Sequence, residues 1–263
     1  PVATGVSVAS IEYSDAEVSQ DLRDYRFHIA KSVARIGHLG VFTEAEIRGA
    51  WNTATLAQAG FEDTLTINAA GLTGQSGYFI AKMRVSGSLL ADASNNGTIY
   101  TGKSETKFSA ILGGNGAYAN LDGGYVRSFD AQSFESYGDI PGLMQVQVPF
   151  TFGSAFNLSG QLTVQSFAAG NTVFNNVWAW SRAEFGHTAY IEGIDEVFTI
   201  DDGTVSDFSV ASVSGSDYIV GFENTVIPES GAYAVVCGAL ALVVVAGSRR
   251  SLRADVRSRA STF

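Results

Sequence analysis

The sequence predicts an all-β protein: an antiparallel β-sandwich or jelly-roll-like domain, followed by a C-terminal hydrophobic helix. Two observations support this prediction. Apolar and polar residues alternate with a period of two in several segments, which is typical of strands that bury one face. Clusters of Gly, Asn and Asp stand between these segments and signal turns. With 263 residues, 46% of them hydrophobic and 16% charged, the chain can form a sizeable core.

The clearest strands lie in the segment 61–225, which we expect to form the sandwich. Residues 144–152, 156–165 and 79–89 each place apolar side chains on one face and polar side chains on the other. Parallel strands need crossover connections of a dozen or more residues, and no such helix is evident after residue 60. We therefore expect antiparallel pairing. Pro149 falls on a polar face, which favours an edge strand or a bulge.

The segment 1–60 gives a mixed signal. Ser14–Glu17 and Thr43–Glu46 both have the spacing of a helix capping box, so short helices are expected near 15–24 and 44–52. The stretch 25–36 reads equally well as a strand. The sequence leaves the fold of this segment open.

The charge distribution excludes one class of partner and divides the chain. The formal net charge is −10, which argues against nucleic acid as a partner, because binding to phosphates needs a basic surface. Residues 1–228 hold 24 acidic and 11 basic residues, whereas residues 229–263 hold 2 acidic and 5 basic ones. The single Cys cannot form an internal disulfide, and three scattered His residues predict no metal site and no cofactor.

The basic end of the chain includes a long uncharged segment. Residues 232–247 carry no charge, and Arg249 and Arg250 follow after Ser248. As a helix this segment spans roughly 24 Å, somewhat less than the ~30 Å hydrocarbon core of a bilayer. A buried core helix is the alternative, but a short transmembrane helix stopped by arginines fits the charge pattern better.

The residues before this helix carry a resemblance to a known family. The motif consists of Val226, Ile227, Pro228, Glu229 and Ser230, and together with the apolar segment and Arg249-Arg250 it resembles the tripartite PEP-CTERM sorting signal of bacteria that make exopolysaccharide. Ser230 stands where that motif has a second Pro. The resemblance implies a sorting signal over 226–250 with a basic tail over 251–263, so that the tail is a processing segment rather than part of the fold.

The same resemblance implies a route and a partner. It implies an exported protein of the cell envelope, cell surface or extracellular matrix, whose β-sandwich is an ectodomain. An exosortase-type enzyme would recognise the signal, and residues 232–247 would hold the chain in the membrane before processing. Such a signal also needs an N-terminal secretory signal peptide, which we expect to have been removed or omitted, unless the sequence is a fragment.

The candidate sugar-binding residues are Trp178, Trp180, Arg182 and Glu184. In a strand these four alternate onto one face, while Val177, Ala179, Ser181, Ala183 and Phe185 take the other. If the second set packs in the core, two tryptophans project outward beside charged groups, as in lectin-like sandwiches. The alternative is that the Trp face is itself the core, or is covered by the segment 1–60.

Other chemistry has weak support. Asp195, Glu196, Asp201, Asp202 and Asp207 crowd together, but they lack EF-hand spacing and read as solvated turn residues. No pattern supports a catalytic nucleophile, so we predict no catalytic residues and no enzyme. The sequence favours a structural or adhesive surface protein, with a carbohydrate-binding module as the alternative. A polysaccharide-active enzyme has the least support.

Overall fold

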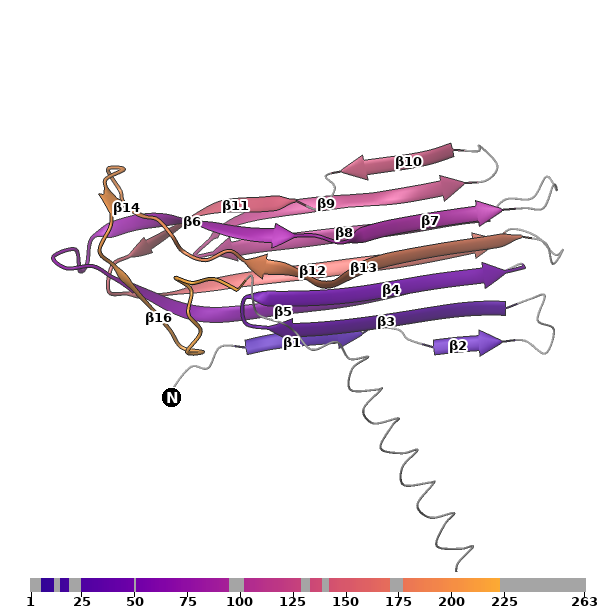
Figure 1. Ribbon diagram of the computed structural model, residues 1–263, viewed down its shortest axis with the longest axis horizontal. Helices are drawn as coiled ribbons and strands as arrows, with labels where there is room; N and C mark the ends of the chain where they lie inside the picture. Colours follow the sequence, from indigo (N-terminus) through magenta and orange to yellow (C-terminus); the bar gives the residue numbers. More distant parts are fainter. Residues whose placement is uncertain are drawn as a thin grey trace, which may run out of the picture. The chain divides into compact units, whose positions relative to one another are not determined.

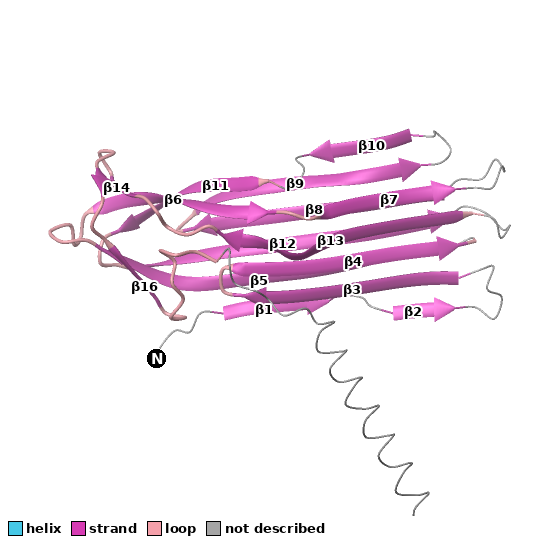
Figure 2. Cartoon of the chain, viewed as in Figure 1, coloured by secondary structure: helices cyan, strands magenta, loops and turns pink. Residues whose placement is uncertain are grey.

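The computed structural model describes residues 6–11, 15–18, 25–49, 51–94, 102–128, 133–138, 142–170 and 177–222. The described residues form strands, turns and loops, and no helix (Figure 2). Every strand pair is antiparallel, which confirms the predicted all-β class. The strands are β1 (Val6–Ile11), β2 (Asp15–Val18), β3 (Tyr25–Arg35), β4 (His38–Arg48), β5 (Asn52–Asn68), β6 (Ser76–Val85), β7 (Ser88–Ser94), β8 (Gly102–Gly114), β9 (Ala117–Ser128), β10 (Ser133–Gly138), β11 (Leu143–Thr151), β12 (Ala155–Gly170), β13 (Trp178–Ile191), β14 (Val197–Thr199), β15 (Thr204–Val205) and β16 (Ser209–Ser212).

These strands form two sheets that stack face to face, and the long strands of both run along the length of the described body (Figure 1). Sheet A has the order β1-β5-β12-β8-β9-β10, with β16 added beside β5. Sheet B has the order β15-β14-β6-β13-β4-β3-β2, with β11 beside β6 and β7 beside β13. The two sheets bury their facing sides against each other, as in a β-sandwich.

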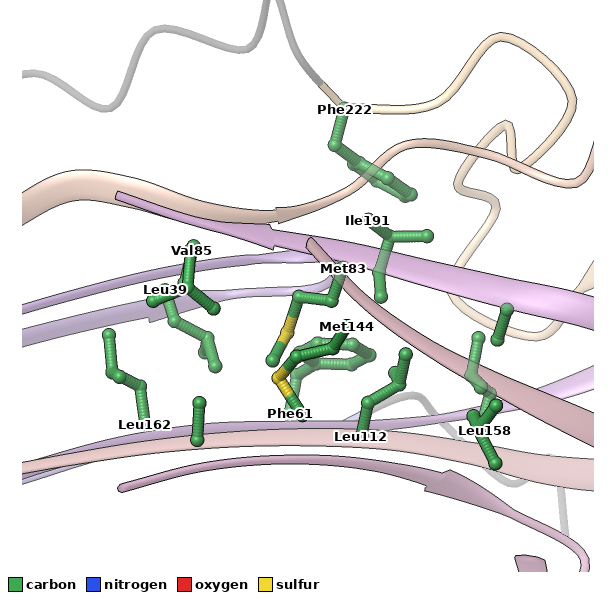
Figure 3. Close-up of a cluster of buried hydrophobic side chains, with 14 of the residues drawn as sticks. Leu39, Phe61, Met83, Val85, Leu112, Met144, Leu158, Leu162, Ile191 and Phe222 are labelled. Carbon is green, nitrogen blue, oxygen red and sulfur yellow. The ribbon is translucent and has the colours of Figure 1, made fainter. Parts of the chain in front are cut away.

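The alternation of apolar and polar residues correctly predicts which side chains lie in the core. Every apolar residue that the pattern of 144–152 assigned to one face is buried, and the same holds for 156–165 and for 79–89. Figure 3 shows Phe61, Leu112 and Leu162 of sheet A packed against Leu39, Met83 and Met144 of sheet B. Burial of this shared layer is the main free energy that holds the two sheets together.

One part of the interface between the sheets is built from small residues. Thr43 on β4 and Ser166 on β12 share a hydrogen bond of 2.8 Å between their hydroxyls, across the two sheets. The Ser181 hydroxyl on β13 donates to the backbone carbonyl of Phe167 on β12, at 2.9 Å. Such short side chains bridge the sheets only where the backbones approach closely. The buried hydroxyls of Thr43, Ser166 and Ser181 are therefore hydrogen-bonded.

The segment 1–60 forms part of both sheets. The helix expected near 44–52 is wrong, because β4 extends to Arg48 and β5 begins at Asn52. Thr43, Ala45 and Ile47 alternate with Glu44 and Glu46, and burying the first set outweighs the capping-box spacing. Of the helix expected near 15–24, residues 15–18 form β2, and 19–24 lie outside the described residues.

The division expected between residues 60 and 61 falls in the middle of β5. The chain instead forms one unit over Pro1–Thr225, and Val226–Phe263 is a second unit that lies outside the described residues. The first unit contains the whole described sandwich.

Two local predictions can be compared directly with the strands. Pro149 lies on β11, which pairs with β6 and, among the described residues, with no strand on its other side, so the expected edge position is confirmed. Asn115 and Gly116 both have positive φ, 48° and 86°, at the tight turn between β8 and β9. This turn needs left-handed backbone at both positions, which Asn and Gly adopt at low cost.

Candidate functional site

β13 places the two candidate tryptophans on the outer side of sheet B. Ala179, Ala183 and Phe185 are each 0% exposed, so this side of the strand faces the core. Trp178 and Trp180 take the opposite side and are half-buried. The outer face of sheet B therefore carries an adjacent pair of aromatic side chains.

Both indole N–H groups form hydrogen bonds with carboxylates on the neighbouring strand β4. The Trp178 Nε1–H donates to Glu46 Oε1 at 2.8 Å, and the Trp180 Nε1–H donates to Glu44 Oε1 at 2.7 Å. Hydrogen bonds to an ionised acceptor are stronger than neutral ones. These bonds fix the orientation of the two half-buried rings.

Arg182 and Glu184 continue the same face. The Arg182 guanidinium donates to Glu184 Oε2 at 2.7 Å and lies over the Phe42 ring, 5.0 Å from its centroid. The ammonium of Lys31 on β3 lies 5.7 Å from the same centroid. Phe42 is thus an aromatic ring with two cations at cation–π distance. We call the set Phe42, Glu44, Glu46, Trp178, Trp180, Arg182 and Glu184 the tryptophan face.

The tryptophan face combines the groups that sugar recognition uses. Aromatic planes pack against the apolar faces of sugar rings, and carboxylate and guanidinium groups hydrogen-bond to hydroxyls. The structure brings together all four residues singled out from the sequence. It adds Phe42, Glu44 and Glu46, which the sequence reasoning missed, although their alternation with Thr43 and Ala45 could have placed them on an outer face.

The remaining acidic and histidine residues form no metal centre in the part of the chain that the structure describes. Asp195, Glu196, Asp201, Asp202 and Asp207 are exposed. His28 is buried, and its Nδ1 shares a hydrogen bond of 2.8 Å with Thr53 Oγ1. His38 is buried beside Tyr190. The side chain of His187 lies outside the described residues.

A buried carboxylate that the sequence reasoning also missed lies on β5 of sheet A. Asp63 is 1% exposed and takes a core position between Phe61 and Leu65. Its Oδ2 accepts from the Ser212 and Ser214 hydroxyls at 2.7 and 2.5 Å, and its Oδ1 accepts from the Ser214 and Thr64 backbone N–H groups at 3.2 and 2.9 Å. The sequence does contain a signal for this buried carboxylate, because Asp63 stands at a position where the alternation of β5 otherwise places apolar residues. We call these residues the Asp63 cluster.

The predicted sorting signal lies outside the described residues. This applies to Val226–Ser230, to the apolar segment 232–247 and to Arg249-Arg250. Among the residues that the structure describes, no helix is long and apolar enough to cross a membrane.

Comparison with known proteins identifies no relative of this chain. No protein-family model, no curated protein and no solved structure matches this chain. The fold and the tryptophan face therefore stand on the sequence and the structure alone.

Proposed function

We propose that this protein is an exported surface or matrix protein with a structural or adhesive role, and that the tryptophan face is its contact surface for extracellular polysaccharide. The observation that carries the adhesive role is the outward placement of Trp178 and Trp180 beside Glu44 and Glu46. The export route rests on the resemblance of residues 226–250 to the PEP-CTERM signal. In this proposal an exosortase-type enzyme acts on that signal, and residues 232–247 anchor the chain before processing.

The geometry of the tryptophan face favours an extended, neutral ligand. Strands β4 and β13 run antiparallel over Arg48–His38 and Trp178–Tyr190, so the aromatic and carboxylate side chains follow one line along the sheet. A polysaccharide is a repeating ligand that can follow such a line. This surface carries the carboxylates of Glu44, Glu46 and Glu184 and the cations of Lys31, Arg48 and Arg182. Its charges therefore balance, which favours neutral sugar residues over charged ones.

Retention of the full-length protein in gels that contain dextran tests this proposal. The double variant Trp178→Ala/Trp180→Ala should lose retention, because it removes both aromatic planes. Tyr118→Ala is the matched control, because Tyr118 is 71% exposed but lies on β9 of sheet A. Equal retention of the wild type and the double variant, across dextran and polysaccharide extracted from the native surface, would contradict the tryptophan face as a glycan surface.

A structural role without a glycan ligand is the second candidate. It is favoured by the hydrogen bonds of the two indole N–H groups, which make each Trp a cross-strand contact between β13 and β4. Cross-strand contacts of this kind stabilise a sheet. The two candidates differ in the cost of removing a ring, which is small for a ligand platform and larger for a structural contact.

A further inference from the structure

A hollow of about 240 Å³ opens on the outer face of sheet A, the sheet that does not carry the tryptophan face. Its lining residues are Lys103, Glu105 and Lys107 on β8, with Gln165 and Phe167 on β12. In the strand register Phe167 lies opposite Glu105, and Gln165 lies opposite Lys107. The five side chains therefore lie on one patch of two neighbouring strands.

The three charged groups form a linked set. Lys107 Nζ lies 2.6 Å from Glu105 Oε1, and Lys103 Nζ lies 3.5 Å from Glu105 Oε2. The side chains of both lysines are 48% exposed, whereas that of Glu105 is 15% exposed. The two ammonium groups therefore reach further toward solvent than the carboxylate that holds them.

The hollow carries a net positive charge in an acidic chain. Partial burial raises the pKa of Glu105, but Lys107 and Lys103 outweigh that effect and hold the pKa below its usual value. Glu105 is therefore ionised at neutral pH, and two lysines against one glutamate leave a surplus of one positive charge. Half of the four lysines in the whole sequence lie here. Such a local charge attracts anions despite the overall charge of −10.

We propose that this hollow binds a carboxylate-bearing sugar residue of an acidic polysaccharide. The sugar carboxylate would lie between the Lys103 and Lys107 ammonium groups, with the ring against Phe167. The Gln165 amide and Glu105 would hydrogen-bond to ring hydroxyls. The hollow is smaller than the roughly 300–1,000 Å³ of pockets for drug-sized ligands, which suits a single sugar residue.

This inference extends the proposed function and rests on it for the presence of polysaccharide, but it uses a separate surface. The two sheets of a sandwich turn their outer faces away from each other. The charges at the tryptophan face balance and the hollow is positive, so the two surfaces would prefer neutral and acidic sugars, respectively. One molecule could then link two polysaccharide chains, and the two contacts together would hold more tightly than either alone.

Binding of the full-length protein to polygalacturonate tests the hollow. Lys103→Ala/Lys107→Ala should weaken binding about tenfold, because two exposed charge contacts are lost. The matched control is Lys82→Ala/Arg84→Ala, which changes net charge equally and also breaks two ion pairs, those with Asp195 and Glu192. The control should change binding less than about twofold. Equal weakening by both double variants, or no weakening by the first, would overturn the inference.

Two further variants separate the hollow from the tryptophan face. Phe167→Ala should weaken polygalacturonate binding, whereas Phe167→Tyr, which keeps an aromatic plane, should retain it. Trp178→Ala/Trp180→Ala should lose dextran but keep polygalacturonate. If dextran retention does not depend on the two tryptophans, the proposed function of the tryptophan face fails. If polygalacturonate binding does not depend on the two lysines, the inference about the hollow fails by itself.

Discussion

Trp180 on β13 donates its indole N–H to Glu44 on β4, although the residue directly opposite Trp180 in the strand register is Glu46. Trp178 makes the same diagonal step to Glu46, and Arg182 makes it onto Phe42. Three successive outward side chains of β13 thus lean in one direction along β4. Diagonal neighbours of this kind lie within reach of long and aromatic side chains. The tryptophan face is therefore an ordered set of side chains.

The half-buried position of Trp180 predicts a modest cost for removing it. Trp180→Ala should lower the free energy of unfolding by about 1–2 kcal/mol, from one hydrogen bond and part of the ring burial. Phe185→Ala, on the core side of the same strand, should cost about 3–5 kcal/mol. Thermal or urea unfolding of the two variants measures the difference. A loss as large for Trp180→Ala as for Phe185→Ala would retire the ligand-platform role and leave the structural role.

The burial of Asp63 predicts that its removal costs more stability than removal of an exposed carboxylate. Asp63→Ala should lower the free energy of unfolding by about 2–4 kcal/mol, because Ser212 and Ser214 lose a buried hydrogen-bond acceptor. Asp195→Ala, which removes an exposed carboxylate paired with Lys82, should change it by less than about 1 kcal/mol. Urea unfolding compares the two. Limited proteolysis should also cut Asp63→Ala faster within 213–222, and equal cleavage rates would argue against the cluster as the attachment of this segment.

Tyr218 predicts a loss of stability at alkaline pH. The Tyr218 side chain is 0% exposed. Burial first, and the negative charge of Asp63 second, raise the pKa of Tyr218. Above about pH 10 the unfolded chain releases this proton and the folded chain keeps it, so folding stability falls as the pH rises. Tyr218→Phe should flatten the stability curve above pH 10 relative to the wild type, as measured by thermal melts.

The sequence motif at 226–230 predicts processing during export. Protein recovered from the native cell surface should end near Pro228–Ser230, and intact-mass measurement would show this. Glu229→Ala should leave a membrane-retained precursor, because the motif would no longer be recognised. A mature pool that ends at Phe263 would contradict the proposed sorting route.

The division after Thr225 predicts that the sandwich folds without the tail. A chain that ends at residue 225 should be soluble and should give a β-type circular dichroism spectrum with a cooperative melt. The reason is that every strand of the two sheets precedes this position. If removal of 226–263 abolished folding, the apolar tail would be a part of the core, and the membrane-anchor proposal would fail.

Much of the fold could be predicted because strand alternation is a local signal. The core residues of 144–152 and 156–165 follow from their own spacing, since every second side chain of a strand points to the same face. The segment around Thr43–Glu46 could not be settled in this way. Its capping-box spacing and its alternation compete, and the decision depends on burial against Ser166, which lies 123 residues away in the chain.

The sequence by itself determined the β class, the antiparallel pairing and the inward side of each clear strand, but it left open whether Trp178 and Trp180 face the core or the outside. It also contains the motif on which the export proposal rests. Only the tertiary structure decided which residues from distant strands lie beside these side chains: Glu44 and Glu46 beside the tryptophans, Ser212 and Ser214 on Asp63, and Phe167 beside Lys103–Lys107. The physical reason is that alternation fixes which face a residue takes, whereas neighbours across a sheet depend on strand order and register, which long-range packing sets.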